Sequence, residues 1–216
     1  MASPKDLPRY YRALLKHYGP RHWWPAETPF EVMVGAILTQ NTAWTNVEKA
    51  IHNLKAAGML EPRPIAEADA ATLARLIRPA GYFNVKARRL QDFVRWFVER
   101  WRGDVRIMRL VPPERMREEL LDVKGIGPET ADSILLYALE HPVFVVDAYT
   151  FRVLHRHGFV GEEATYDEMK EIFEGTVPRD AALFNDFHAQ IVNVGKDFCR
   201  ATPRCEKCPL RKFLPG

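Results

Sequence analysis

The sequence predicts an all-α protein, because apolar residues recur with helical spacing, helix-start signals are frequent and almost no segment has a strand pattern. Residues 85–101 show the spacing best, since their apolar side chains recur along a single helical face. These are Leu90, Phe93, Val94, Phe97 and Trp101. The one strand-like stretch, residues 143–146, cannot form a sheet alone. At the mean helix length we expect about ten helices.

Helix starts and ends are marked along the chain. Thr28 is followed by Pro29 and, three residues after the threonine, by Glu31, which predicts an N-cap. Thr45 and Thr165 each precede a glutamate by three residues, and we expect capping boxes at both. Glycines are expected to end four helices. They are Gly19, Gly58, Gly103 and Gly158.

Composition places the 216-residue chain among globular proteins, with 47% hydrophobic and 27% charged residues. No apolar run approaches the roughly 20 residues that cross a bilayer, and residues 1–11 lack a secretory signal pattern. We therefore expect a soluble cytoplasmic protein, nucleoid-associated if prokaryotic, with no membrane partner. Three cysteines, all in the last 18 residues, argue against a disulfide scaffold and favour a local metal or cluster site.

Charge is segregated along the chain, although the net charge is only +3. Residues 75–109 carry ten Lys/Arg against three acids, whereas residues 114–186 carry 16 acids against seven bases. Residues 196–212 add six bases and two acids. Such segregation is consistent with a cationic face for a polyanion and equally with solvated helix surfaces.

The segment around Gly125-Ile126-Gly127 predicts two helices joined by a tight turn, the first from Glu114 to about Asp122 and the second from Pro128. Glycines permit positive φ and let the backbone approach another surface closely. Exposed amides before a helix N-terminus can bind a phosphate. Gly-x-Gly alone more often marks an ordinary helix corner, because glycine is common at helix ends.

In its wider context, the segment resembles the helix-hairpin-helix of the DNA glycosylase superfamily to which endonuclease III belongs. Four further motifs match that family in order, so the resemblance covers about residues 28–214. They are residues 28–42, Gly81-Tyr-Phe-Asn-Val-Lys-Ala87, residues 145–153 and the C-terminal cysteines.

The resemblance implies two helical domains with a cleft between them. Residues 29–138 would form one, with the hairpin at about 121–134, and residues 1–28 with 139–216 would form the other, discontinuous one. It also implies a monomer that binds double-stranded DNA containing a damaged base. Such enzymes extrude the base and cleave its N-glycosidic bond in base excision repair.

The resemblance assigns the catalytic carboxylate to Asp147, which follows residues 143–146 and opens a helix. A fixed carboxylate stabilises positive charge on the sugar and can deprotonate the attacking water. By itself Asp147 could be a simple N-cap. Glu129 occupies the position of the lysine nucleophile of the family's lyases, and a carboxylate cannot form an imine. We therefore expect a monofunctional glycosylase.

By resemblance, DNA contacts come from three turns. Gln40 and Asn41 match the gap-filling turn, Tyr82 and Phe83 the wedge, and Lys124, Gly125, Ile126 and Gly127 the phosphate-binding hairpin. Tyr82 and Phe83 could instead be core aromatics. Candidates for stacking on a flipped base, each of which could equally be packing residues, are Trp23, Trp24, Trp44, Tyr149 and His188.

The C-terminal loop resembles the family's iron–sulfur loop, in which four cysteines hold a [4Fe-4S] cluster. Cys199, Cys205 and Cys208 are present, and the fourth cysteine, expected near Leu214, is absent. A labile cluster, a three-iron cluster, a loop without cofactor and three reduced structural cysteines all remain open. The resemblance also implies a monovalent cation at the hairpin carbonyls.

Residues 124–137 and 146–149 look more like the 3-methyladenine branch of the family than the branch acting on oxidised pyrimidines. Aromatic side chains would suit a cationic alkylated purine. The alternatives are a bifunctional glycosylase/lyase of the endonuclease III type and a non-catalytic DNA-binding protein that keeps only the hairpin.

Overall fold

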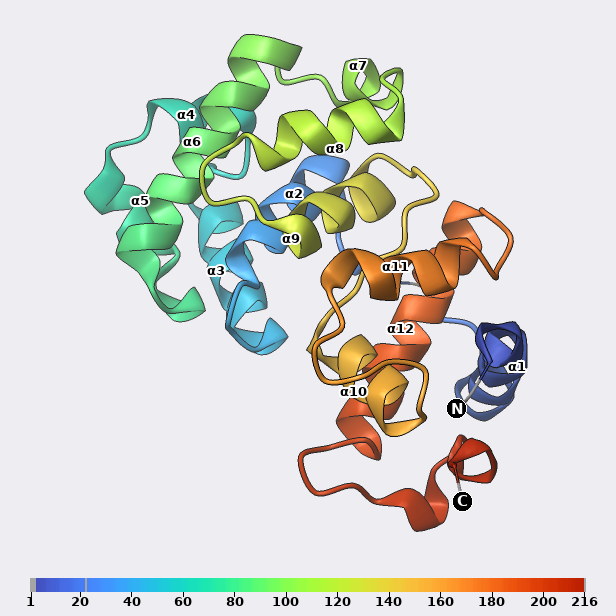
Figure 1. Cartoon of the computed structure of the whole chain (residues 1–216). Coiled ribbons are helices and arrows are strands. Elements are labelled where there is room, and N and C mark those ends of the chain that lie inside the picture. The colour runs from blue at the N-terminus through green and yellow to red at the C-terminus, as the bar shows by residue number, and fades with distance from the viewer. Residues whose placement is uncertain (1–2, 22, 216) are drawn as a thin grey trace. The chain divides into compact units, whose positions relative to one another are not determined.

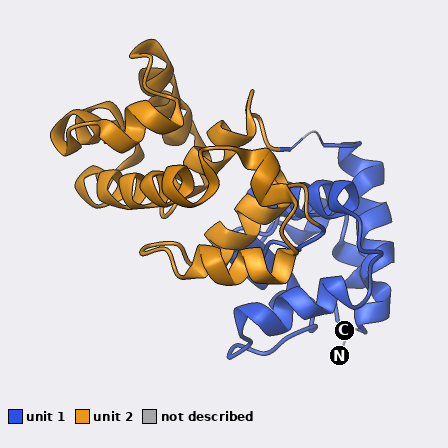
Figure 2. Cartoon of the chain, turned by 90° about the horizontal axis from the view of Figure 1, so that it is seen from above, with its two compact units in different colours: residues 1–23, 142–216 blue, residues 24–141 orange. Residues whose placement is uncertain are grey.

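The computed structural model describes residues 3–21 and 23–215. The chain divides into two compact units, residues 24–141 and residues 1–23 with 142–216 (Figure 2). The observed boundaries, 23/24 and 141/142, differ by a few residues from those expected at 28/29 and 138/139. The unit of residues 1–23 and 142–216 is discontinuous because residues 24–141 are inserted between its α1 (Leu7–Tyr18) and α10 (Ala148–Arg156).

Both units are helical, and the described residues contain no β-strand, which confirms the all-α prediction. The unit of residues 24–141 contains α2 (Pro29–Leu38), α3 (Trp44–Ala56), α4 (Pro62–Glu67), α5 (Ala70–Leu76), η2 (Arg78–Ala80), α6 (Phe83–Trp101), α7 (Val105–Arg109), α8 (Pro113–Leu121), α9 (Pro128–Ser133) and the π-helical η3 (Ile134–Ala138). The other contains η1 (Pro4–Asp6), α1 (Leu7–Tyr18), α10 (Ala148–Arg156), α11 (Tyr166–Glu174), α12 (Ala181–Asp197), η4 (Cys205–Lys207) and η5 (Arg211–Phe213).

Helix α2 is the central helix of the unit of residues 24–141 (Figure 1). Every residue from Phe30 to Leu38 is buried, as expected for a helix that is apolar on all sides. It packs against α3, α6, α9 and η3. Its last turn therefore lies close to both α6 and the α8–α9 hairpin.

Two of the three predicted N-caps are confirmed. The Thr28 hydroxyl accepts from the Glu31 N–H, and Thr165 forms a capping box with Glu168. The prediction for Thr45 is wrong, because α3 begins at Trp44 after an Ala43 N-cap. Trp44 Nε1 donates to Glu48 Oε1 at 2.9 Å. The Glu48 carboxylate therefore binds the Trp44 indole and does not form a capping box with Thr45. The four predicted helix-ending glycines all have positive φ.

A buried lysine joins two turns of the same unit. Lys86 is 2% exposed, and its Nζ donates to the Leu38 carbonyl at 2.8 Å and to the Ala80 carbonyl at 2.7 Å. Those carbonyls lie at the ends of α2 and η2, where helices leave unpaired acceptors. Burial, and secondly the charge of Arg89, lowers the pKa of Lys86 to about 8.

The strand-like residues 143–146 are not helical, and within the described chain they pair with no strand. Side chains of α11 take the place of a sheet: Glu174 Oε1 accepts from the Phe144 N–H at 2.8 Å, and the Tyr166 hydroxyl oxygen accepts from the Val146 N–H at 3.3 Å. The Phe144 ring stacks on Phe173 with a centroid separation of 3.8 Å. These contacts fix the segment that ends at Asp147.

The unit with both termini is built on α12, which packs against α1 and α10. Gly195 permits the approach of α10, because a Cβ there would overlap the Tyr149 side chain. Among the described residues, no helix combines the length and apolarity needed to cross a membrane.

Lys86 predicts a pH dependence of stability. Its pKa falls from 10.5 to about 8 on folding, so the unfolded chain binds more protons between those values and the free energy of unfolding rises with pH there. The neutral amine can still donate to both carbonyls. Between pH 8 and pH 10, the free energy of unfolding measured with urea should rise in the wild type relative to Lys86→Met. The difference should approach a limit on the order of 3 kcal/mol. A parallel pH dependence in the two proteins would contradict this.

Candidate active site

Asp147 caps the N-terminus of α10 and is held from two sides. Its Oδ1 accepts from the Thr150 N–H at 2.7 Å and from the Thr150 hydroxyl at 2.9 Å. Its Oδ2 lies 3.6 Å from His188 Nε2 of α12. The side chain is 14% exposed, so the carboxylate is fixed and largely buried.

The environment of Asp147 favours its ionised form. Burial raises the pKa of this carboxyl, but the neighbouring His188 and the two Thr150 hydrogen bonds lower it by more. The net result is a pKa below the ordinary value of 3.8. The helix N-terminus acts in the same direction. Asp147 is therefore a carboxylate at neutral pH, able to stabilise a cation or accept a proton.

The α8–α9 hairpin has the predicted form. Helix α8 ends at Leu121 and α9 begins at Pro128, and Ile126 is 5% exposed and plugs the turn into the core. Gly125 has φ +90°, whereas Gly127 has an extended φ of −100°, so only the first glycine needs the left-handed region. Within the described chain, the N–H groups of Lys124, Gly125 and Gly127 donate to no other residue, and they remain available to an anion.

Gln40 is tied to the hairpin. Its Nε2 donates to the Gly125 carbonyl and to the Thr130 hydroxyl, both at 3.1 Å, and its Oε1 accepts from Arg89 at 2.7 Å. Asn41, next to it, is exposed and adopts φ +53°. Of the two residues predicted to fill the DNA gap, Asn41 thus carries the freer side chain. The Gly125 carbonyl, one of those expected near a monovalent cation, already accepts one bond.

The two predicted wedge residues, Tyr82 and Phe83, also differ from each other. Tyr82 is 73% exposed and has φ +45°, a strained conformation for a residue with a side chain. Phe83 is half-buried in the first turn of α6, with the Arg78 guanidinium 6.0 Å from its ring centroid. Tyr82 is therefore the ring presented to solvent. Strained exposed residues often mark functional sites.

Glu129 lies exposed in the first turn of α9, and Lys124 lies exposed on the other side of the turn. The residue that the resemblance assigns to the lyase position is therefore an exposed carboxylate. The acid also suits the positive end of the α9 backbone.

The candidate stacking residues are divided between the units. In residues 24–141, Trp24 contacts Trp44 at 4.9 Å and Tyr137 at 5.1 Å between ring centroids. Gly35 of α2 lets the Trp24 indole approach, since a Cβ there would lie 3.2 Å from its Nε1. A cavity beside these rings is lined by Trp24 and Trp44, by three carboxylates and by one lysine. Lys55 pairs with Glu27 and Glu31 at 3.0 Å, and Glu48 is the third carboxylate.

In the other unit, Trp23 lies under Lys196, and Tyr149 packs between Gly195 and Arg152. His188 is buried beside Asp147, a contact that the sequence does not predict. His188 is 41 residues from Asp147 in the chain, so no local pattern joins them.

The basic residues of the stretch 75–109 are only in part available for DNA. Lys86 is buried, and three arginines form ion pairs within the unit: Arg100 with Glu119, Arg106 with Asp104, and Arg109 with Glu140. The cationic surface is thus smaller than the count of Lys and Arg predicts.

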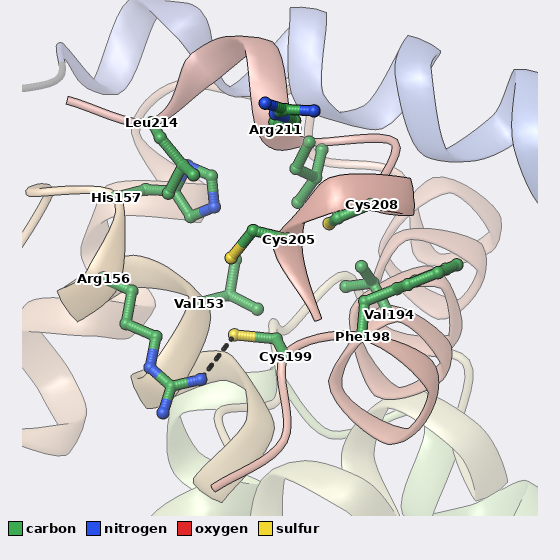
Figure 3. A pocket seen from close by; sticks show the side chains of 11 residues that line it. Val153, Arg156, His157, Val194, Phe198, Cys199, Cys205, Cys208, Arg211 and Leu214 are labelled. Atoms are coloured by element: carbon green, nitrogen blue, oxygen red, sulfur yellow. Dashed lines mark hydrogen bonds between the residues drawn. The ribbon is translucent and has the colours of Figure 1, made fainter. Parts of the chain in front are cut away.

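The three cysteines line one cavity with residues of α10 and α12 (Figure 3). They are free thiols, and Arg156 Nη1 lies 3.3 Å from Cys199 Sγ. Among the described residues, no three His, Cys, Asp or Glu side chains are placed to hold a single metal ion. Three thiols around one cavity supply three of the four thiolates that a [4Fe-4S] cluster ordinarily takes.

Comparison with known proteins agrees with these features. A family model described as "HhH-GPD superfamily base excision DNA repair protein" matches residues 34–179. A provisionally named DNA repair glycosylase of Methanocaldococcus jannaschii, MJ1434, is 49% identical over 95% of this chain and 94% of its own. Endonuclease III of Thermotoga maritima is 31% identical over 93% of this chain and 88% of its own.

Among solved structures, Helicobacter pylori 3-methyladenine DNA glycosylase (MagIII) bound to 1,N6-ethenoadenine has a TM-score of 0.76 and 32% identity. The match covers 90% of this chain and 98% of that one. A trapped endonuclease III–DNA covalent intermediate has a TM-score of 0.84 at 22% identity, over 99% and 96% of the two chains, and shows the shared fold alone.

The two hairpin glycines predict different effects of alanine. In Gly125→Ala, the new Cβ would lie 2.6 Å from Arg89 Cγ at φ +90°, so unfolding in urea should reveal a loss of about 1–3 kcal/mol. Gly127→Ala is the matched control, because its φ is extended and no atom lies within 4 Å of the added Cβ. Equal stability losses in the two variants would contradict the hairpin geometry.

Proposed function

Because the chain belongs to the HhH-GPD superfamily of base excision DNA repair proteins, we propose that it is a monofunctional DNA glycosylase for alkylated purines, with Asp147 as its catalytic carboxylate. Membership of this family confirms the resemblance found in the sequence. The geometry of Asp147 carries the mechanistic part of the proposal, since the carboxylate is ionised and held in place at the start of α10.

Hydrolysis needs one fixed carboxylate and one water molecule. As the glycosidic bond breaks, positive charge grows on the sugar, and the Asp147 carboxylate stabilises it. Water adds to the anomeric carbon, and Asp147 accepts the proton that the water loses. A cationic alkylated purine departs as a neutral base, so it needs no proton from the enzyme. His188 and Thr150 position the carboxylate.

The substrate class is supported by two observations. MagIII, to which the chain is 32% identical, is a 3-methyladenine DNA glycosylase. The cavity beside Trp24 and Trp44 offers aromatic rings that can stack on a purine, whereas two of its carboxylates, Glu27 and Glu31, are already paired with Lys55. An assay that offers alkylated, deaminated and oxidised duplexes should therefore show release of 3-methyladenine. Release of oxidised pyrimidines without alkylated purines would contradict this assignment.

DNA binding is assigned to backbone and side-chain groups of the unit of residues 24–141. The free amides of the hairpin would contact phosphates, and the basic residues that lack an internal acid would add salt-dependent affinity. Tyr82 and Asn41, both exposed at positive φ, would enter the gap left by the extruded base. Gln40 would support this turn through its bonds to the hairpin.

Asp147→Asn tests the catalytic assignment. Asparagine keeps the N-cap but removes the charge, so single-turnover base release should fall on the order of 10²–10⁴-fold while duplex binding is retained. Asp180→Asn is the matched control, because Asp180 caps α12 of the same unit. Unchanged release by Asp147→Asn would remove Asp147 from the mechanism, and absence of release by the wild type on every duplex would indicate a non-catalytic DNA-binding protein.

The position of Glu129 predicts that no Schiff base forms. Borohydride treatment of the wild type with an abasic duplex should yield no covalent adduct, because the residue at the lyase position offers no amine. Endonuclease III, treated in parallel, serves as the positive control. A trapped adduct would show that another amine acts as nucleophile and would favour the bifunctional alternative.

A further inference from the structure

The C-terminal cavity holds three thiols and a histidine. Its lining includes Cys199, Cys205, Cys208, His157 and Leu214. Leu214 stands where the four-cysteine loop would supply its last thiolate, and an aliphatic side chain cannot bind iron. Figure 3 shows the His157 ring beside Cys205 and Leu214. His157 comes from the end of α10, 42 residues before the first of the cysteines.

The hydrogen bonds of His157 indicate which ring nitrogen faces the cavity. The Tyr10 hydroxyl donates to the Phe213 carbonyl at 3.1 Å, so its oxygen is free to accept from His157 Nδ1–H at 3.0 Å. Nδ1 also lies 3.4 Å from the same carbonyl. With the proton on Nδ1, Nε2 carries a lone pair, and it bonds to no described residue. Histidines that bind metals are oriented in this way by an outer hydrogen bond.

Burial and charge at the cavity also fit a metal cluster. His157 is 4% exposed, so its ring is held in place at the cavity wall. Arg156 donates to Cys199 Sγ, and Arg211 lines the same cavity, so two cations can offset the negative charge of thiolates and sulfide. Thiolates bind the outside of an iron–sulfur cluster and so stand further apart than around one ion, which agrees with the lack of a single-ion site.

We propose that His157 Nε2 is the fourth protein ligand of a [4Fe-4S] cluster whose other ligands are Cys199, Cys205 and Cys208. The step is ligation alone: each thiol loses a proton, each sulfur and the imidazole nitrogen bind one iron, and no electron is transferred. The ligand lost at Leu214 is thereby replaced from α10. This assignment concerns the cofactor and does not depend on the substrate proposed above.

The test uses the full-length protein purified without oxygen. Iron and sulfide analysis should give a four-iron cluster in the wild type, and pulsed EPR of the reduced cluster should show nitrogen coupling from a directly bound imidazole. His157→Ala should lose the fourth iron and give the EPR signal of an oxidised three-iron cluster. His157→Cys should retain four irons, lose the nitrogen coupling and have a lower reduction potential, since histidine ligation raises the potential relative to thiolate.

His155→Ala is the matched control, because His155 lies on the same helix and is not among the residues that line the cavity. It should behave as the wild type. An iron-free wild type, a wild-type cluster without nitrogen coupling, or a four-iron cluster of unchanged potential in His157→Cys would each overturn the assignment. The nitrogen coupling is measured on the wild type, so it decides the question even if His157→Ala fails to fold.

Discussion

The carboxylate of Asp147, kept ionised at the start of α10, is the constraint on which the functional account depends. A largely buried acid would ordinarily become neutral, and here Thr150 and His188 prevent this. The surrounding unit serves to hold it: Glu174 and Tyr166 bind the backbone of residues 143–146, and Phe144 anchors them on the aromatic core. Helix capping and catalysis therefore use the same geometry.

In the unit of residues 24–141, a buried lysine likewise holds the turns that carry candidate functional residues. Lys86 binds the carbonyl ends of α2 and η2, and Gln40 connects the end of α2 to the hairpin. The turns that these contacts hold present Asn41 and Tyr82, each in a left-handed conformation. Two residues in strained, exposed positions are thus supported by buried polar bonds, an arrangement typical of a preorganised binding surface.

Local signals made much of the fold and part of the site predictable. Thr28, Thr165 and the helix-ending glycines mark boundaries through contacts within a few residues, and the sequence predicts them correctly. Thr45 shows the limit, because a bond between Trp44 and Glu48 replaced the expected cap. Three other contacts could not be predicted. The bond of Lys86 to Leu38, the bond of Gln40 to Gly125 and the pairing of His188 with Asp147 each join residues at least 41 positions apart, so no local sequence pattern indicates them.

The ionisation state of Asp147 is the central claim, and carboxyl-carbon NMR measures it directly. With ¹³C-labelled aspartate, assigned by comparison with Asp147→Asn, the Asp147 carboxyl signal should keep its ionised chemical shift from pH 8 down to pH 5, because its pKa lies below 3.8. A carboxyl that titrates within that range would have a raised pKa, so burial would outweigh the contacts with Thr150 and His188, and such a result would contradict the account.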